Sequence, residues 1–152
     1  MRTYSPSALK KALTGKRVLV DTNIIIYLTD AVQPFAQASR SIFQLIEHGD
    51  LFAVFSILSV AEVMQGPLRR GLIQNAMDAK TYLLNFPNST CQDITTQVIE
   101  EIGKDQRIQW KKLRTIDTLI IASGLVNQVD LIISNDAHFQ SALPEDLIFS
   151  LT

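Results

Sequence analysis

Short, uninterrupted apolar runs are the feature that most constrains the fold of this chain. They cover residues 18–20, 51–55, 131–133 and 147–149. A continuous apolar run of this length is typical of a strand buried on both faces, as in a parallel sheet. Parallel neighbours cannot be joined by tight hairpins, so these runs predict long crossover connections between the strands.

The segments between these runs carry the start and stop signals of helices. Ser5 followed by Pro6 predicts the start of a helix, which we expect to end at Gly15. Ser59 predicts the start of another helix, with its end at residues 66–67, and residues 85–89 have the composition of a turn. The other helices are predicted over residues 22–28, 34–48, 68–84, 90 or 93 to 102, 115–125 and 137–142.

The alternation of helices and apolar runs predicts an α/β domain with a mainly parallel central sheet and helices on both sides. The chain has 152 residues, of which 47% are hydrophobic. That size and composition are sufficient for a well-buried core, and they exclude intrinsic disorder, which needs low hydrophobicity and high charge. No internal repeat or linker divides the sequence.

Composition removes several classes of function. A single cysteine, Cys91, excludes a disulfide within the chain, and with only two histidines a Cys/His zinc site is excluded too. The formal net charge of −1 gives no overall attraction to nucleic acid, although basic residues gather in residues 1–17 and 104–114. The longest uncharged apolar stretch, 51–61, is too short to span a bilayer. We therefore expect a cytoplasmic protein with no membrane association.

Four carboxylates fall where a site is expected. Asp21 directly follows the first apolar run, and Asp136 lies just past the third. The carboxyl ends of parallel strands form the edge where α/β sheets bind ligands. Glu62 and Asp117 lie in the first turns of two predicted helices, which begin at the same rim in many such folds. The sequence therefore predicts that the four side chains converge.

Each of these carboxylates also has a purely structural interpretation. Asp21 and Asp136 are both suitable caps for the helices that follow them. Glu62 stands three residues after Ser59, which is the spacing of a capping box. Asp117 would complement the dipole of its helix. If the four side chains lie close together in space, they form a site; if they lie apart, each has only a structural role.

If the carboxylates converge, their mutual repulsion raises their pKa values, and a divalent cation removes the conflict. Oxygen ligands without cysteine or histidine favour Mg²⁺ or Mn²⁺. Such an ion activates a bound water and supports phosphodiester hydrolysis. Glycine-rich phosphate loops and the Gly-x-Ser-x-Gly motif are absent. Asn23 stands where an Asp-x-Asp phosphatase has its second Asp, and no Lys follows Asp136, as a receiver domain would require.

Four segments in order resemble the motifs of the PIN-domain family, and most closely those of the toxin ribonucleases of VapBC toxin–antitoxin pairs. The first is a strand followed by Asp-Thr-Asn, and the second has Ser, Glu and a trailing Gly. The third surrounds Asp117, and the fourth is Ser-Asn-Asp with a Phe three residues on; Ser134 stands where Thr is common and keeps a hydroxyl. The segments are residues 18–24, 59–66, 115–122 and 131–139.

The resemblance implies a three-layer α/β/α sandwich and an Mg²⁺- or Mn²⁺-dependent ribonuclease. It implies that Asn23 and Ser134 support the acidic set by hydrogen bonds. Many toxins of the family are homodimers that an antitoxin neutralises with a basic tail in the acidic site. Residues 1–16 would be an N-terminal helical extension of a single domain over residues 17–152. The catalytic and metal-binding set would be Asp21, Glu62, Asp117 and Asp136.

An acidic site that cuts RNA needs basic groups around it for the phosphates. The sequence offers candidates in two places, and each is equally explained as solvated helix surface. A non-catalytic PIN scaffold that binds RNA or protein, or one that acts without an antitoxin, is the alternative function. The candidate RNA contacts are Arg69, Arg70, Lys111, Lys112 and Arg114.

Overall fold

The structure, a computed structural model, describes residues 4–152, and Arg2 of the N-terminal basic run lies outside them. Five strands form one sheet in the order β3-β2-β1-β4-β5, and every neighbouring pair is parallel. The predicted parallel sheet is therefore confirmed. The strands are β1 (Arg17–Val20), β2 (Phe52–Ser56), β3 (Ser89–Gln92), β4 (Leu131–Ile133) and β5 (Ile148–Phe149).

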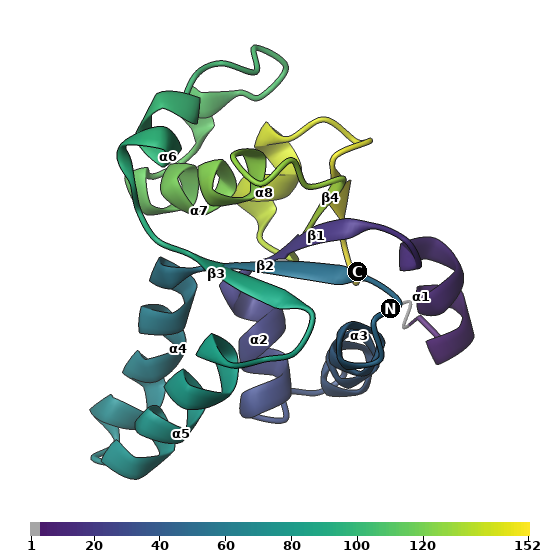
Figure 1. The fold of residues 1–152 in the computed structure, drawn as a ribbon, viewed down its shortest axis with the longest axis vertical. Coiled ribbons are helices and arrows are strands. Elements are labelled where there is room, and N and C mark those ends of the chain that lie inside the picture. Colours follow the sequence, from purple (N-terminus) through teal and green to yellow (C-terminus); the bar gives the residue numbers. More distant parts are fainter. Residues whose placement is uncertain (1–3) are drawn as a thin grey trace.

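Helices cover both faces of this sheet, which confirms the three-layer α/β/α sandwich. In Figure 1, α2 and α3 lie on one side of the strands, and α7 and α8 lie on the other. The helices are α1 (Pro6–Leu13), α2 (Thr22–Thr29), α3 (Ala36–Glu47), α4 (Ile57–Arg69), α5 (Ile73–Leu84), α6 (Thr96–Glu101), η1 (Trp110–Lys112), α7 (Thr115–Leu125) and α8 (Ala137–Ala142). In the described part of the chain, no helix has the length and hydropathy to cross a membrane.

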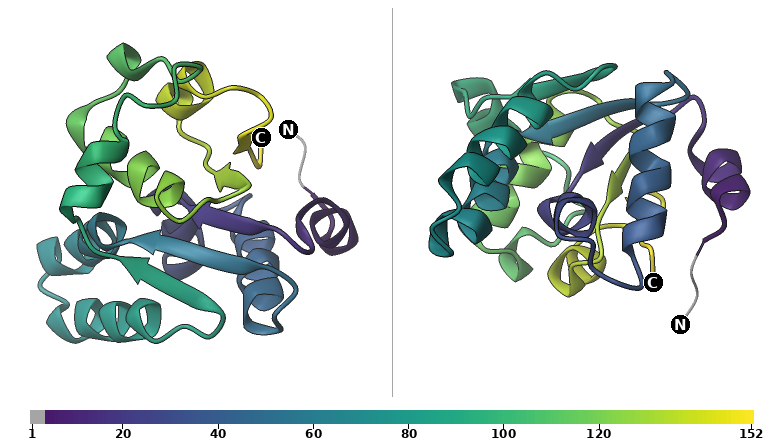
Figure 2. Two further views of the ribbon diagram at one scale, coloured as in Figure 1. Left: turned by 45° about the horizontal axis from the view of Figure 1, so that its top comes forward. Right: turned by 90° about the horizontal axis from the view of Figure 1, so that it is seen from below.

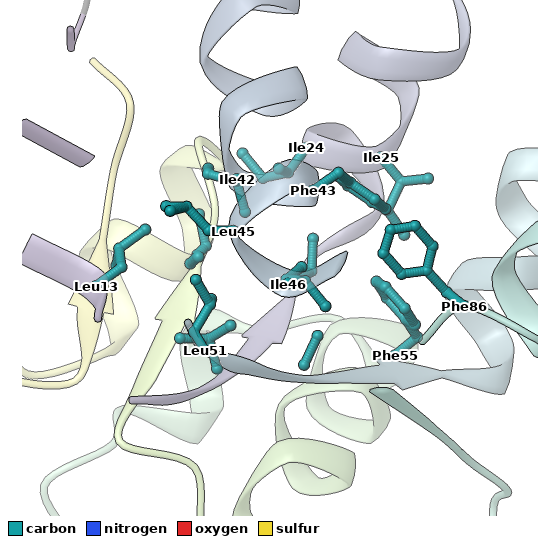
Figure 3. Close-up of a cluster of buried hydrophobic side chains, with 14 of the residues drawn as sticks. Leu13, Ile24, Ile25, Ile42, Phe43, Leu45, Ile46, Leu51, Phe55 and Phe86 are labelled. Carbon is teal, nitrogen blue, oxygen red and sulfur yellow. The ribbon is translucent and has the colours of Figure 1, made fainter. Parts of the chain in front are cut away.

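The two faces of the sheet explain why the strand sequences are apolar without interruption. Val18 and Val20 belong to a core cluster with Phe55 and the side chains of α2 and α3, part of which Figure 3 shows. Leu19, between them, points to the opposite face and belongs to a second cluster formed with α7 and α8. Because successive side chains of a strand point to opposite faces, both sets must be apolar.

Helix α1 packs on the side of the sandwich. Its Leu9 and Leu13 are fully buried, and it lies beside α3 (Figure 2). The ring of Tyr4, just before the helix, lies 5.2 Å from the ring of Phe149 in β5. The helical part of the predicted extension over residues 1–16 thus shares the core of the rest of the chain.

The predicted turn is present over residues 85–88, but a helix that begins at residue 90 is wrong, because strand β3 occupies residues 89–92. This strand lies at the edge of the sheet and pairs only with β2. Its residues, including Thr90 and Cys91, are only half-buried, so the sequence carries no apolar run there. The next helix, α6, begins after Thr95, whose side chain accepts a hydrogen bond from the backbone N–H of Val98.

Helix α4 begins earlier and ends later than the signals in its sequence suggest. Its cap is Ser56, whose hydroxyl accepts from the N–H of Leu58, and it continues through Gly66 and Pro67 to Arg69. The predicted break at residues 66–67 is therefore wrong. A proline normally excludes the helical conformation of the residue before it by contact with that residue's Cβ. Gly66 has no Cβ, so the helix passes through.

The helix predicted over residues 68–84 is divided by a turn around Gly71, where φ is +73°. Glycine adopts this left-handed conformation without the steric cost that a side chain brings. The result is an α4–α5 hairpin, visible at the lower left of Figure 1. Helix α2 begins at Thr22, as predicted, and its cap is Asp21.

Candidate active site

The site lies at the carboxyl ends of the two central strands, β1 and β4. Val20 pairs with Ile133 in this register, so Asp21 and Ser134 leave the sheet at the same level. A pocket of about 160 Å³ opens there. The structure brings all four predicted carboxylates into its lining. The pocket is lined by Asp21, Thr22, Asn23, Ile26, Glu62, Arg114, Asp117, Ile120 and Asp136.

Asp21 is both the cap of α2 and the most enclosed acid of the β1–β4 edge. One carboxylate oxygen, Oδ1, accepts from the N–H of Thr22 at 2.8 Å, and Oδ2 accepts from the hydroxyl of Ser134 at 2.6 Å. Burial raises the pKa of Asp21 to about 6, and the charges of Asp136 and Glu62 add to the rise. The two hydrogen bonds act in the opposite direction. A buried, crowded carboxylate of this kind is a feature of functional sites.

Glu62 reaches the pocket from the second turn of α4. Since the cap of α4 is Ser56, Ser59 is buried inside the helix and the capping-box interpretation of Glu62 is wrong. Instead, Oε1 of Glu62 accepts from the hydroxyl of Thr22 at 2.7 Å. That hydroxyl also lies 2.9 Å from Oγ of Ser59. Sequence reasoning missed Thr22, although a hydroxyl directly after the first acid was a signal.

Asp117 is buried near the start of α7 and is held by Arg114, the cap residue of that helix. The guanidinium donates from Nε to Oδ2 and from Nη2 to Oδ1 of Asp117, both at 3.0 Å. The backbone N–H of Arg114 adds a third bond to Oδ2 at 3.2 Å. The pKa of Arg114 is raised, most by Asp117 and further by the charges of Asp136 and Glu62. Arg114 is thus a cation placed among the carboxylates.

Asp136 caps α8 and is joined to Asp21 through one serine. Its Oδ1 accepts from the N–H groups of His138 and Phe139 at 2.7 and 3.3 Å. Its own N–H donates to Oγ of Ser134 at 3.0 Å, while the Ser134 hydroxyl donates to Asp21. The side-chain oxygen of Asn23 accepts from the N–H of Asn135 at 3.4 Å. These bonds hold the loop after β4 against the start of α2.

The basic candidates are distributed unequally around the pocket. Arg114 lines it, and Lys111 and Lys112 are exposed in η1, three and two residues before Arg114. Arg69 ends α4, about 10 Å along the helix axis from Glu62. Arg70 lines a different pocket of about 450 Å³, between α2, α4 and α5. The structure therefore does not bring Arg69 and Arg70 into the acidic pocket.

The chemistry of the donor set fits a hard divalent cation. Carboxylate oxygens are the ligands that Mg²⁺ and Mn²⁺ prefer. Burial is the main cause of the raised pKa of Asp21, and the charges of Asp136 and Glu62 add to it, so a cation bound nearby would favour the charged form. Within residues 4–152, no three Asp, Glu, His or Cys side chains are grouped closely enough to hold a metal ion as they stand. Both oxygens of Asp117 are taken by Arg114. The cation found among the acids is thus the protein's own guanidinium.

Fold and pocket together define an all-parallel α/β/α domain with a four-carboxylate pocket at the carboxyl edge of its sheet. Residues 18–142 match the model of the PIN domain, and the chain belongs to the PIN-domain family. Membership implies a divalent metal ion, and the fold is the one that the family's nucleases share. No curated protein matches the chain significantly in sequence.

Solved structures with this fold include several from toxin–antitoxin pairs. VapBC2 from Rickettsia felis, bound to a DNA fragment from its promoter, has a TM-score of 0.66 and 15% identity over 88% of this chain and 98% of that one. A toxin–antitoxin complex from Klebsiella pneumoniae has a TM-score of 0.62 and 19% identity over 89% and 98%. VapC20 from Mycobacterium tuberculosis, a toxin that cleaves the sarcin-ricin loop, has a TM-score of 0.60 and 14% identity over 84% and 97%. At these identities the likeness shows a shared fold.

Proposed function

We propose that this protein is a metal-dependent endoribonuclease of the VapC type, which hydrolyses RNA phosphodiester bonds at the four-carboxylate pocket. One observation carries the proposal: four acids from distant parts of the chain line a single pocket in a PIN domain. Caps of helices that follow adjacent parallel strands also meet at this edge, but Glu62 caps no helix and still lines the pocket. The description of VapC20 as a toxin that cleaves the sarcin-ricin loop supports the same reaction class.

In this proposal Asp21, Glu62, Asp117 and Asp136 hold Mg²⁺ or Mn²⁺. When bound, such an ion would supply Lewis acidity for activating a water and positive charge to balance the charge that develops on the phosphate. The protein's own contribution is orientation. Ser134 fixes Asp21 and Asp136 relative to each other, and the hydroxyl of Thr22 fixes Glu62. Such supporting hydrogen bonds keep ligand oxygens aimed at a metal.

The decisive experiment is cleavage of end-labelled single-stranded RNA in EDTA, Mg²⁺ and Mn²⁺, with Asp136→Asn in parallel. We expect cutting in either metal, no cutting in EDTA, and a loss of more than about 100-fold in the variant, because outer partners of metal ligands alone contribute 10–100-fold. Cutting that survives in Asp136→Asn would indicate a contaminating ribonuclease. Absence of cutting together with absence of metal binding would favour the non-catalytic scaffold.

RNA binding should depend most on the basic residues next to the pocket. Lys111→Ala with Lys112→Ala removes two charges within about 10 Å of Arg114 along the backbone. Arg69→Ala with Arg70→Ala removes the same charge at the far end of α4. For catalytically inactive protein, we expect the lysine pair to lower RNA affinity about tenfold and to reduce the salt slope by about one to two, and the arginine pair to do less. A larger effect of the arginine pair would place the RNA path across the end of α4.

We further propose that the protein is a homodimer and that a cognate antitoxin neutralises it. Several structures with the same fold were solved as toxin–antitoxin complexes, which supports a partner of this kind. The pocket is lined by four acids and a single cation, Arg114. A neutralising segment would therefore present basic side chains to it.

A further inference from the structure

We propose that Arg114 is a built-in counter-ion of the acidic pocket, which a divalent metal must displace from Asp117 in order to bind. The inference rests on the metal site of the proposed function. It assigns to Arg114 a role beyond that of an RNA contact. In this role the guanidinium of Arg114 competes with the metal ion for the carboxylate of Asp117.

Both oxygens of Asp117 accept hydrogen bonds from Arg114. Nε and Nη2 of Arg114 bond Oδ2 and Oδ1 in the paired, two-point arrangement that guanidinium groups form with carboxylates. The side chain of Asp117 is only 4% exposed, and the opening that it borders is the acidic pocket itself. A metal ion that approaches an oxygen of Asp117 from the pocket meets a guanidinium already bonded to that oxygen, so we expect it to break at least one of these bonds.

The two partners differ in their freedom to move, and this difference decides which one yields. Asp117 is enclosed in α7, whereas the side chain of Arg114 is 65% exposed at the mouth of the pocket. A guanidinium and a divalent cation that share one carboxylate would also repel each other. Arg114 is therefore the group that leaves, and solvent or a substrate phosphate can receive it without any change in the backbone.

Two consequences of this competition can be measured. Replacing Arg114 with Gln removes the competitor, so the affinity for Mn²⁺ should increase by roughly three- to tenfold, a modest figure because the pair is partly exposed. The metal-free protein should become less stable, because the buried carboxylate of Asp117 then loses its charged partner and keeps only the backbone N–H of residue 114. Saturating Mn²⁺ should restore that stability. A residue with only a structural role would not produce tighter metal binding when removed.

The chain offers a closely matched control in Arg107. Arg107 pairs with Asp105 through Nε at 3.2 Å and Nη2 at 2.9 Å, but Asp105 is more exposed than Asp117, at 27%, and the pair lies outside the pocket lining. Arg107→Gln therefore removes the same charge and a similar pair, and it should leave the affinity for Mn²⁺ within about twofold of the wild type. An Arg114→Lys variant keeps the charge without the two-point bond and should bind Mn²⁺ with intermediate affinity.

The test is calorimetric titration of the whole protein with Mn²⁺ alone, for the wild type and the variants Arg114→Gln, Arg114→Lys, Arg107→Gln and Asp117→Asn. The expected order of affinity is Arg114→Gln, Arg114→Lys, then wild type and Arg107→Gln together, with Asp117→Asn weakest.

Unchanged or weaker binding in Arg114→Gln would overturn the competition while leaving the metal site intact. An equal gain in Arg107→Gln would also overturn it, by showing a general charge effect. If no variant and no wild type binds Mn²⁺, both this inference and the proposed function fail. Should Arg114→Gln not fold, Arg114→Lys decides alone.

Discussion

Replacing Asp21 with Asn should abolish metal-dependent RNA cleavage and yet leave a protein that is more stable than the wild type at pH 7 without metal. We expect a loss of activity of more than about 100-fold, because the carboxylate itself, and not an outer partner, is removed from the pocket. The amide oxygen of the introduced side chain can still accept from the N–H of Thr22 and so retain the cap of α2. The substitution therefore separates the chemistry of Asp21 from its structural role.

The gain in stability follows from the pKa of Asp21, which rises from 3.8 to about 6 on folding. A raised pKa means that the folded protein holds this proton more tightly than the unfolded chain does. The stability contributed by the group is therefore fully present below about pH 4 and is lost as the pH rises toward about 6. At pH 7 the charged form costs about 3 kcal/mol, at about 1.36 kcal/mol for each pKa unit.

Urea unfolding in EDTA between about pH 4 and pH 7.5 measures this effect. The free energy of unfolding of the wild type should decline relative to that of Asp21→Asn as the pH increases. The same exchange at Asp146, whose side chain is 72% exposed, should alter neither activity nor the pH dependence of stability. Parallel pH profiles for the wild type and Asp21→Asn would show that burial of Asp21 does not perturb its ionisation.

Replacing Gly124 with Val should destabilise the fold by about 3 kcal/mol. Gly124 lies in α7 where the helix meets the sheet, and a Cβ there would come within 3.0 Å of two side-chain carbons of Leu19 and 3.2 Å of one of Val129. Adding volume to a filled core of this kind costs up to about 3 kcal/mol. Asp117 lies two turns earlier in the same helix, so displacement of α7 should also lower cleavage.

Gly124→Ala provides a graded control. The smaller side chain makes the same first contact, but alanine favours a helix by about 1 kcal/mol over glycine. We expect a net destabilisation of about 1 kcal/mol or less, measured by urea unfolding at one pH. A Gly124→Val protein with wild-type stability would mean that α7 packs farther from β1 than the structure places it.

The positions of Asp21 and Asp136 were predictable because each depends on local pattern alone. An apolar run followed by an acid places that acid at the carboxyl end of a buried strand, and parallel pairing brings such ends to one edge. The helix around Asp117 and the alternation of strands and helices were predictable from the same kind of local pattern, namely apolar runs and the helix signals between them. The motif around residue 62 predicted a functional Glu62, but it did not exclude a capping box with Ser59. Only the structure, in which α4 begins after Ser56, excluded the capping box.

The positions of other parts of the site and the fold depend on contacts between residues that are distant in the sequence. Strand β3 forms because β2 offers it an open edge, and its half-buried residues carry no strong signal of their own. Thr22 faces Glu62, 40 residues away, only because α2 and α4 begin at the same edge. The pocket's own cation, Arg114, likewise has its position among the other acids fixed by the docking of α7 on the sheet.

The sequence by itself thus determined the layer architecture and the identity of the acids. Buried strands appear in it as continuous apolar runs, and helix ends appear as capping and turn residues. Only the tertiary structure decided which oxygens of those acids are free and which are occupied. Hydrogen bonds between distant residues depend on angles and distances that sequence spacing does not encode. The pairing of Arg114 with Asp117 inside the pocket, and the burial that raises the pKa of Asp21, belong to that second kind of information.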